Sequence, residues 1–199
     1  MSQLTPESSQ RAVLVHSAPV HGRAVLHDSS HPLAAFDALV GRRCPLTGCL
    51  DATSVERLGA MLAAGDAAGQ AAVGAIVLTL EGEGSAGDDP DAPEAVLRDA
   101  LRVQTSRFLM RHVRGSEPLI RSDDDEFLVL MPGAQEFDTE RVARRVQLSA
   151  FNKAPAALTL GWTARRGGEA LGALVARARA ARVPVPQGGR GEERRKYVS

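Results

Sequence analysis

Hydrophobic residues recur at helical spacing in some stretches of the chain and form continuous runs in others, and this alternation predicts the elements of the main body. Residues 71–80 (AAVGAIVLTL) form an apolar, β-branched run that is typical of a strand covered on both faces. Residues 53–65 place apolar side chains at helical spacing between a capping-box pair, Thr53 and Glu56, and a terminal Gly65. The predicted order is a helix over 53–65, a strand over 71–80, a helix over 93–113, a hairpin with strands over 118–120 and 127–131, a helix over 138–151, a strand over 156–163 and a helix over 168–182.

This order of elements predicts an α/β fold, an α+β sandwich in which helices flank a central sheet of mixed strand directions. Residues 81–93 hold several carboxylates among Gly, Ser and Pro and are expected to form a solvated acidic loop. In the helix over 93–113, Pro93 fits the first turn. The inward face of this helix is expected to carry Leu97, Leu101, Phe108 and either His112 or Val113.

The remaining segments define the domain boundaries. Residues 1–31 mix Ser, Pro and His with two short β-like runs and are expected to form a partly flexible N-terminal extension. Residues 32–182 are expected to form the domain, beginning with a lead-in helix over 32–40. Because Pro184 and Pro186 prevent the last helix from continuing, residues 183–199 are expected to form a flexible basic tail.

Composition narrows the classes of partner. The 199 residues carry 24 Lys+Arg against 24 Asp+Glu, so the formal net charge is zero and the broad attraction to nucleic acid or anionic membranes is absent. No apolar stretch approaches the roughly 20 residues that a membrane-spanning helix needs, and the first residues lack the pattern of a secretion signal. We therefore expect a cytoplasmic protein with no nucleic-acid partner and no membrane insertion.

Candidate metal ligands are few. Cys44 and Cys49 flank a Pro-Leu-Thr-Gly turn, and no further cysteine completes a metal site, so we expect two reduced, half-buried thiols. Most of the 5 histidines lie within residues 1–31, at spacings that do not share one face. No metal site and no other cofactor is expected.

Three short motifs follow one another along the predicted elements. The turn Cys44-Pro45-Leu46-Thr47-Gly48-Cys49 is similar to D-x-L-T-G-L, and Thr159-Leu160-Gly161 is similar to S-I-G in a later strand. The hairpin tip is similar to R-Y-G-G-D-E-F over Arg121, Ser122, Asp123, Asp124, Asp125, Glu126 and Phe127. With these motifs, residues 44–182 resemble the GGDEF domain of the diguanylate cyclases, which join two GTP molecules into cyclic di-GMP.

The chain departs from the pattern of active members of this family. Asp123 and Asp124 replace the two tip glycines, whose lack of a Cβ lets the backbone approach the nucleotide. Thr79 stands where the family has its first metal-binding aspartate, and a neutral hydroxyl is a poor Mg²⁺ ligand. The family's F-K-x-x-N-D stretch is replaced at residues 83–88, and its phosphate-contacting lysine falls near Pro186. The resemblance with these losses implies a degenerate domain with no cyclase activity and no catalytic residue.

The charge of the tip is a further departure. If no cation lies beside them, the carboxylates of residues 123–126 repel one another and a triphosphate.

A second site of the family has a counterpart here. Many members bind cyclic di-GMP at an R-x-x-D motif five residues before the tip signature, and Arg114 and Glu117 occupy these places. An arginine fork can donate two hydrogen bonds to guanine or phosphate, and a carboxylate can accept from guanine N–H groups. The resemblance implies a degenerate cyclic di-GMP site; the alternative is an ordinary solvated ion pair that contributes about 0–1 kcal/mol.

Two classes of function follow. The first is a catalytically inactive signalling protein that acts as a cyclic di-GMP receptor or as a protein-interaction adaptor. The alternative is a ligand-independent protein-binding scaffold or an inactive partner of an active diguanylate cyclase. Because the family assembles its catalytic site across two subunits, the resemblance also allows a dimer.

Overall fold

The computed structural model describes residues 43–65, 71–82, 92–114 and 116–188. The predicted N-terminal extension, the lead-in helix over 32–40, most of the acidic loop and the tail after residue 188 lie outside the described residues. Within the described ranges, no helix combines the length and the apolar composition needed to cross a membrane.

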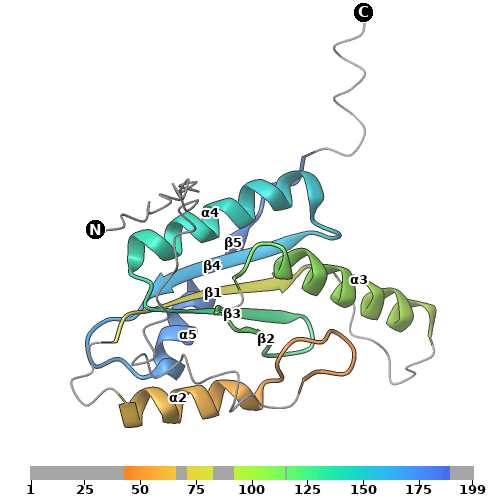
Figure 1. The fold of residues 1–199 in the computed structure, drawn as a ribbon. Coiled ribbons are helices and arrows are strands. Elements are labelled where there is room, and N and C mark those ends of the chain that lie inside the picture. Colours follow the sequence, from red (N-terminus) through yellow and green to blue (C-terminus); the bar gives the residue numbers. More distant parts are fainter. Residues whose placement is uncertain (1–42, 66–70, 83–91, 115, 189–199) are drawn as a thin grey trace, which may run out of the picture.

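A five-stranded sheet in the order β2-β3-β1-β4-β5 forms the middle layer of the molecule (Figure 1). The strand pairs in this sheet are all antiparallel, and an isolated bridge between Leu50 and Ile120 is parallel. The strands are β1 (Val73–Leu80), β2 (Leu119–Arg121), β3 (Glu126–Pro132), β4 (Leu158–Ala164) and β5 (Val183–Pro184).

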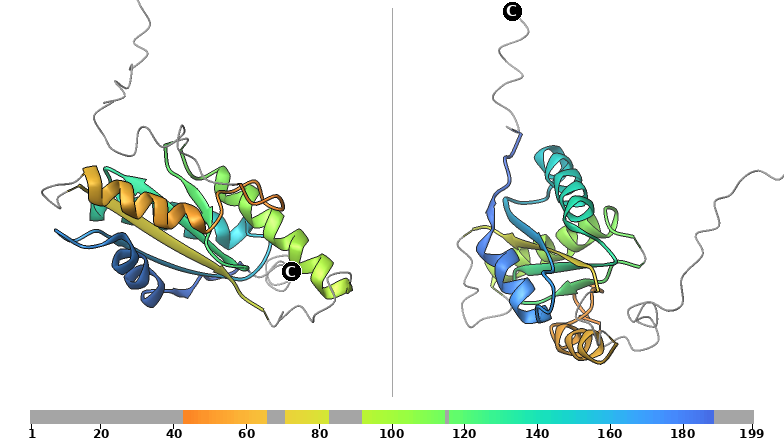
Figure 2. Two further views of the ribbon diagram at one scale, coloured as in Figure 1. Left: turned by 90° about the horizontal axis from the view of Figure 1, so that it is seen from below. Right: turned by 90° about the vertical axis from the view of Figure 1, so that its left-hand side faces the viewer.

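Among the described residues, four helices cover the two faces of the sheet: α2 (Thr53–Gly65), α3 (Pro93–Met110), α4 (Glu136–Lys153) and α5 (Leu171–Ala180). The helices α3 and α4 pack on one face and α2 and α5 on the other, as the right-hand view of Figure 2 shows. The predicted order of elements and the sandwich of helices on a central sheet are therefore confirmed, with β5 as an additional strand. The predicted mixture of strand directions is wrong, because every strand pair of the sheet is antiparallel.

Strand β1 contributes to the cores on both faces of the sheet because it is apolar on both faces over most of its length. Alternation along the strand places Ile76 and Leu78 in the core beneath α3 and α4, whereas Ala75 and Val77 belong to the core above α2 and α5. All four side chains are fully buried, which confirms the prediction of a strand covered on both faces.

The predicted inward face of α3 is wrong over its first half. Leu97 is 62% exposed, and the buried positions in this half of the helix are Ala95, Arg98 and Arg102. The helix also ends at Met110, so His112 and Val113 lie in the turn that follows. The first half of α3 lies beside the hairpin tip, where carboxylate and carbonyl oxygens accept hydrogen bonds that a leucine cannot donate.

The segment after α5 also differs from the predicted flexible tail. Residues 183–184 form β5, which pairs with β4, and the side chain of Val185 is buried. The backbone N–H of Val185 donates to the carbonyl oxygen of Leu158 at 2.8 Å. Helix α5 ends at Ala180, and Pro184 lies in β5, an edge strand in which a proline is tolerated because its missing N–H does not interrupt the sheet.

Candidate functional site

The β2–β3 hairpin carries the predicted site residues at one end of the sheet. Arg121 ends β2, Glu126 begins β3, and the backbone N–H of Ser122 donates to the carbonyl oxygen of Glu126 at 3.0 Å. The backbone carbonyl of Asp125 accepts from the N–H of Leu80 at 2.9 Å, so the tip is joined to the end of β1. Phe127 faces away from this site, since its side chain is fully buried in the core beneath α3 and α4.

Asp125 is held by two arginines from α3. The Nη2 atom of Arg98 donates to Oδ2 at 2.9 Å, and the Nε atom of Arg102 donates to Oδ1 at 2.9 Å. Arg98 also donates to the carbonyl oxygens of Glu81 and Leu80, at 3.1 and 3.2 Å. Burial raises the pKa of the Asp125 carboxyl, but hydrogen bonds from the two arginines outweigh it, so the pKa lies below its ordinary value.

Glu126 is held in the same way from the other face of the sheet. The Nη2 atom of Arg179, on α5, donates to Oε1 at 2.7 Å, and Nη1 of Arg182 lies 3.4 Å from Oε2. The hydroxyl of Ser122 donates to Oε1 at 2.7 Å. Glu126 is therefore a buried carboxylate with its hydrogen-bonding capacity directed into the protein.

Thr79 lies directly opposite Glu126 in the pairing of β1 with β3. Its hydroxyl oxygen accepts a hydrogen bond from Nη1 of Arg182 at 2.6 Å. Thr79, which the resemblance aligns with a metal-binding aspartate, is thus a neutral group that already contacts a cation.

The residues present do not fit a divalent metal ion. Within the part of the chain that the structure describes, no group of three or more His, Cys, Asp or Glu side chains has a geometry that could hold one. The two carboxylates of the tip nearest to β1, those of Asp125 and Glu126, both accept from guanidinium groups. Mg²⁺ requires oxygen ligands that face a common centre, and here the arginines occupy that space.

Asp123 and Asp124 are the exposed part of the tip. Asp124 has 81% of its side chain exposed and pairs with Arg121 at 2.9 Å, and Asp123 accepts from the backbone N–H of Asp124 at 2.8 Å. The sequence predicts strong repulsion among the tip carboxylates only if no cation lies beside them. In the structure, arginines of α3, α5 and β2, and Arg182 just beyond α5, lie beside these carboxylates, so that condition is not met.

Sequence reasoning missed these arginines. Their signal is present in the chain: Arg98 and Arg102 are four residues apart on α3, and Arg179 lies near the end of α5, with Arg182 just beyond it. Pairs at this spacing lie on one face of a helix, but nothing local indicates that the face is buried against a hairpin tip.

The predicted ligand pair after α3 is brought together by a closed turn. The backbone N–H of Arg114 donates to Oε2 of Glu117 at 2.8 Å, and the N–H of Glu117 donates to the carbonyl oxygen of Arg114 at 2.9 Å. Glu117 is buried, whereas Arg114 is exposed. Both residues line a surface cavity of about 210 Å³ that also includes Arg141 of α4 and Gly133.

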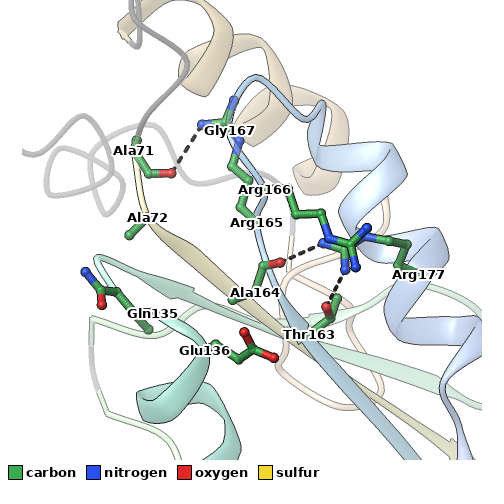
Figure 3. Close-up of a pocket in the computed structure, with 11 residues that line it drawn as sticks. Ala71, Ala72, Gln135, Glu136, Thr163, Ala164, Arg165, Arg166, Gly167 and Arg177 are labelled. Atoms are coloured by element: carbon green, nitrogen blue, oxygen red, sulfur yellow. Dashed lines mark hydrogen bonds between the residues drawn. The ribbon is translucent and has the colours of Figure 1, made fainter.

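A second cavity, of about 330 Å³, lies at the opposite end of the sheet, where β1 begins and β4 ends (Figure 3). Arg165, Arg166 and Arg177 line it, together with Glu136 from the first turn of α4. Arg177 donates to both oxygens of Glu169 at 2.7 Å. The hydrogen bond from Arg177 lowers the pKa of Glu169 to about 2, against the opposing effect of burial.

Comparison with known proteins identifies the fold. No protein-family profile and no curated protein matches the chain. Among solved structures, the GGDEF domain of FimX from Pseudomonas aeruginosa superposes with a TM-score of 0.59 at 18% identity, covering 71% of this chain and 91% of that one. The GGDEF domain of DgcB from Caulobacter crescentus, in complex with cyclic di-GMP, gives a TM-score of 0.56 at 15% identity, covering 70% and 86%.

A third similar structure is the diguanylate cyclase SiaD from Pseudomonas aeruginosa in complex with its activator SiaC. It gives a TM-score of 0.56 at 26% identity and covers 75% of this chain and 59% of that one. The chain therefore has a GGDEF-like fold.

Proposed function

We propose that this chain, whose fold is GGDEF-like, is a catalytically inactive signalling module that works by binding, as a cyclic di-GMP receptor or as an adaptor for a protein partner. The observation that carries the proposal is the pairing of Asp125 and Glu126 with arginines of α3, with Arg179 of α5 and with Arg182 just beyond α5.

The pairing opposes catalysis for an energetic reason. A metal ion at Asp125 would have to displace Arg98 and Arg102, whose side chains are each only 10% exposed. Removing the carboxylate from two largely buried guanidinium groups costs several kcal/mol, which metal binding would have to exceed. The side chains of Asp123 and Asp124 also occupy tip positions at which active family members have glycine.

The receptor role is supported by the cavity that Arg114, Glu117 and Arg141 line. Cyclic di-GMP carries phosphodiesters and guanine edges, and a guanidinium group can donate paired hydrogen bonds to either. Glu117 accepts from the backbone N–H of Arg114, which holds the turn that presents the Arg114 side chain. One of the similar domains, that of DgcB, was solved with cyclic di-GMP.

The adaptor role is supported by a different surface. Helix α4 exposes three large apolar side chains, those of Phe137, Leu148 and Phe151, with Leu148 75% exposed. Exposed apolar groups on one element favour contact with another protein. This surface also suits the alternative functions, a ligand-independent scaffold or an inactive partner of an active diguanylate cyclase.

Calorimetric titration of cyclic di-GMP into the full chain tests the receptor role. We expect saturable binding in the micromolar range or tighter, lost in Arg114→Ala. The matched control is Arg144→Ala, because Arg144 is an exposed arginine of α4 outside the cavity. If the wild-type protein releases no heat and gains no thermal stability, the receptor role is wrong, and capture of protein partners tests the adaptor role.

A separate assay tests the absence of catalysis. Incubation of the protein with GTP and Mg²⁺ or Mn²⁺ is expected to give no cyclic di-GMP. Turnover that disappears in Asp125→Asn or Glu126→Gln would contradict the proposal, because it would show that the tip carboxylates bind the metal despite their arginine partners.

A further inference from the structure

The turn over residues 44–49 brings the only two cysteines of the chain, Cys44 and Cys49, face to face. Arg43 and Leu50 form an antiparallel bridge, and next to it Gly48 and Cys49 together oppose Cys44, in the pattern of a β-bulge. The backbone N–H of Cys44 donates to the carbonyl oxygen of Cys49 at 2.8 Å. Gly48, with a φ of 73°, closes the turn in a conformation that side chains rarely adopt.

This pairing sets a separation that a disulfide can span. One N–H···O bond of 2.8 Å joins the backbones of Cys44 and Cys49, which keeps their Cα atoms within about 7 Å of each other. Disulfides occur at Cα separations of about 4.4–6.8 Å. The backbone N–H of Cys49 donates to the hydroxyl oxygen of Thr47 at 3.4 Å, and the Thr47 side chain acts to lower the pKa of both thiols, so it lies beside both cysteines.

The two thiols differ in their surroundings. Cys44 is 8% exposed and its sulfur accepts a hydrogen bond from Nη1 of Arg121 at 3.3 Å, whereas Cys49 is 1% exposed. Burial raises the pKa of the Cys44 thiol, but hydrogen bonds from Thr47 and Arg121 and from the turn backbone outweigh it, and the pKa falls from 9.0 to about 7. Burial raises the pKa of Cys49. Cys44 is therefore the nucleophilic member of the pair.

We propose that Cys44 and Cys49 form an oxidisable dithiol, in which a peroxide oxidises Cys44 and Cys49 converts the product into an intramolecular disulfide. The Cys44 thiolate attacks a peroxide oxygen, the O–O bond breaks, and a sulfenic acid forms as hydroxide leaves. The Cys49 sulfur then attacks the Cys44 sulfur, the S–O bond breaks, and the Cys49 proton leaves with the hydroxyl group as water. Two thiols lose two electrons in total, and one peroxide is reduced.

The dithiol is coupled to the acidic hairpin tip through Arg121. The same guanidinium group that donates to the Cys44 sulfur donates to Oδ1 of Asp124 at 2.9 Å and to the carbonyl oxygen of Asp124 at 3.2 Å. Disulfide formation removes the negative sulfur from this contact, so Arg121 loses one of its anionic partners. Oxidation at the turn therefore changes the contacts that Arg121 makes with the exposed tip.

The experiment uses the full chain, since any thiol chemistry in it belongs to these two residues. After treatment with hydrogen peroxide at neutral pH, intact mass spectrometry is expected to show the loss of two hydrogen atoms without a covalent dimer, reversed by dithiothreitol. The Cys49→Ser variant is expected to accumulate a sulfenic acid that dimedone traps, and Cys44→Ser is expected to resist the same dose. Circular dichroism checks that each variant is folded.

A second measurement does not depend on those variants. Timed alkylation of the wild-type protein, followed by peptide mapping, is expected to label Cys44 before Cys49, and Arg121→Gln is expected to shift the midpoint of Cys44 alkylation to higher pH. Hydrogen exchange at residues 121–126 is expected to change after oxidation. Two free thiols remaining in the native protein at a dose that oxidises the unfolded chain would overturn the proposal, as would equal labelling of both cysteines.

Discussion

At the hairpin tip, neighbouring carboxylates differ sharply in their surroundings. The side chain of Asp125 is 22% exposed and accepts hydrogen bonds from two arginines, whereas that of Asp124 is 81% exposed and accepts from one arginine. An ion pair in solvent contributes about 0–1 kcal/mol, but a guanidinium group left without its partner in a largely buried position is costly. We therefore expect the same Asp→Asn substitution to change the free energy of unfolding by different amounts at these two adjacent positions.

Asp125→Asn is expected to lower the free energy of unfolding by about 2–4 kcal/mol, because it removes the charge that compensates Arg98 and Arg102. Asp124→Asn, the matched control, is expected to change it by less than about 1 kcal/mol. Urea denaturation of both variants gives the comparison. Equal, small effects would show that the arginine pairs contribute little to the fold.

The ion pair between Glu169 and Arg177 has a predictable dependence on pH. The folded-state pKa of Glu169, about 2, lies below its ordinary value of 4.5. Its charged form therefore stabilises the fold above about pH 4.5, and this contribution is lost as the pH falls from 4.5 toward 2.

We expect Glu169→Gln to be less stable than the wild-type protein by about 1–3 kcal/mol at pH 7, with a smaller difference at pH 3. Denaturant unfolding at the two pH values measures it. Glu140→Gln, at the surface pair with Arg144, is the control and should show a difference below about 1 kcal/mol at both. A difference for Glu169→Gln that does not shrink on acidification would rule out this ion pair as its source.

At the scale of elements, helix α5 holds the site only because it packs directly on β4. A Cβ atom at Gly161 of β4 would lie 2.7 Å from the backbone nitrogen of Arg182 and closer still to the carbonyl oxygen of Ala178. The absence of a side chain at this position lets the end of α5 approach the sheet. That approach places Arg179 and Arg182 against Glu126.

Gly161→Ala is therefore expected to displace α5 and to lower the free energy of unfolding by about 1–3 kcal/mol. Gly172→Ala is the control, because Gly172 is an exposed position of α5 with no atom near the added methyl group. In a helix this change should stabilise the protein by roughly 0.5–1 kcal/mol. Thermal unfolding monitored by circular dichroism compares the two variants. A Gly161→Ala protein as stable as the wild type would mean that α5 does not pack closely on β4.

Helix α3 shows why the register of a single element was predicted incorrectly. Leu97 and Leu101 are four residues apart, and so are Arg98 and Arg102. The two rows are adjacent on the helix surface, about 100° apart, so periodicity allows either to face inward. The choice depends on what lies opposite, and the structure places Asp125 there.

At the scale of the whole molecule, the two cores share the same strands. Leu109 lies in the core beneath α3 and α4, and Leu174 in the core above α2 and α5, and both side chains are fully buried. Because alternate residues of β1 and β3 belong to opposite cores, neither layer can lose its packing without disturbing the sheet. The described domain is therefore expected to unfold as one cooperative unit.

Leu109→Ala and Leu174→Ala are each expected to lower the free energy of unfolding by about 2–4 kcal/mol without changing the denaturant slope. Trp162, the single tryptophan, packs against the core beneath α3 and α4 and reports on it by fluorescence. Fluorescence and far-ultraviolet circular dichroism should give coincident transitions in both variants. A Leu174→Ala protein whose fluorescence transition stays at the wild-type midpoint would show that the two layers unfold separately.

The sequence by itself determined the kinds of element, their order and the sandwich they form, because apolar periodicity is a local property. It also determined, through short motifs in order, the resemblance that the solved GGDEF domains support at the level of the fold. Only the tertiary structure decided the partners of the tip: Arg98 is 27 residues from Asp125, and Arg179 is 53 residues from Glu126. Contacts across such separations depend on how helices lie on a sheet, and residue spacing along one element carries no record of that placement.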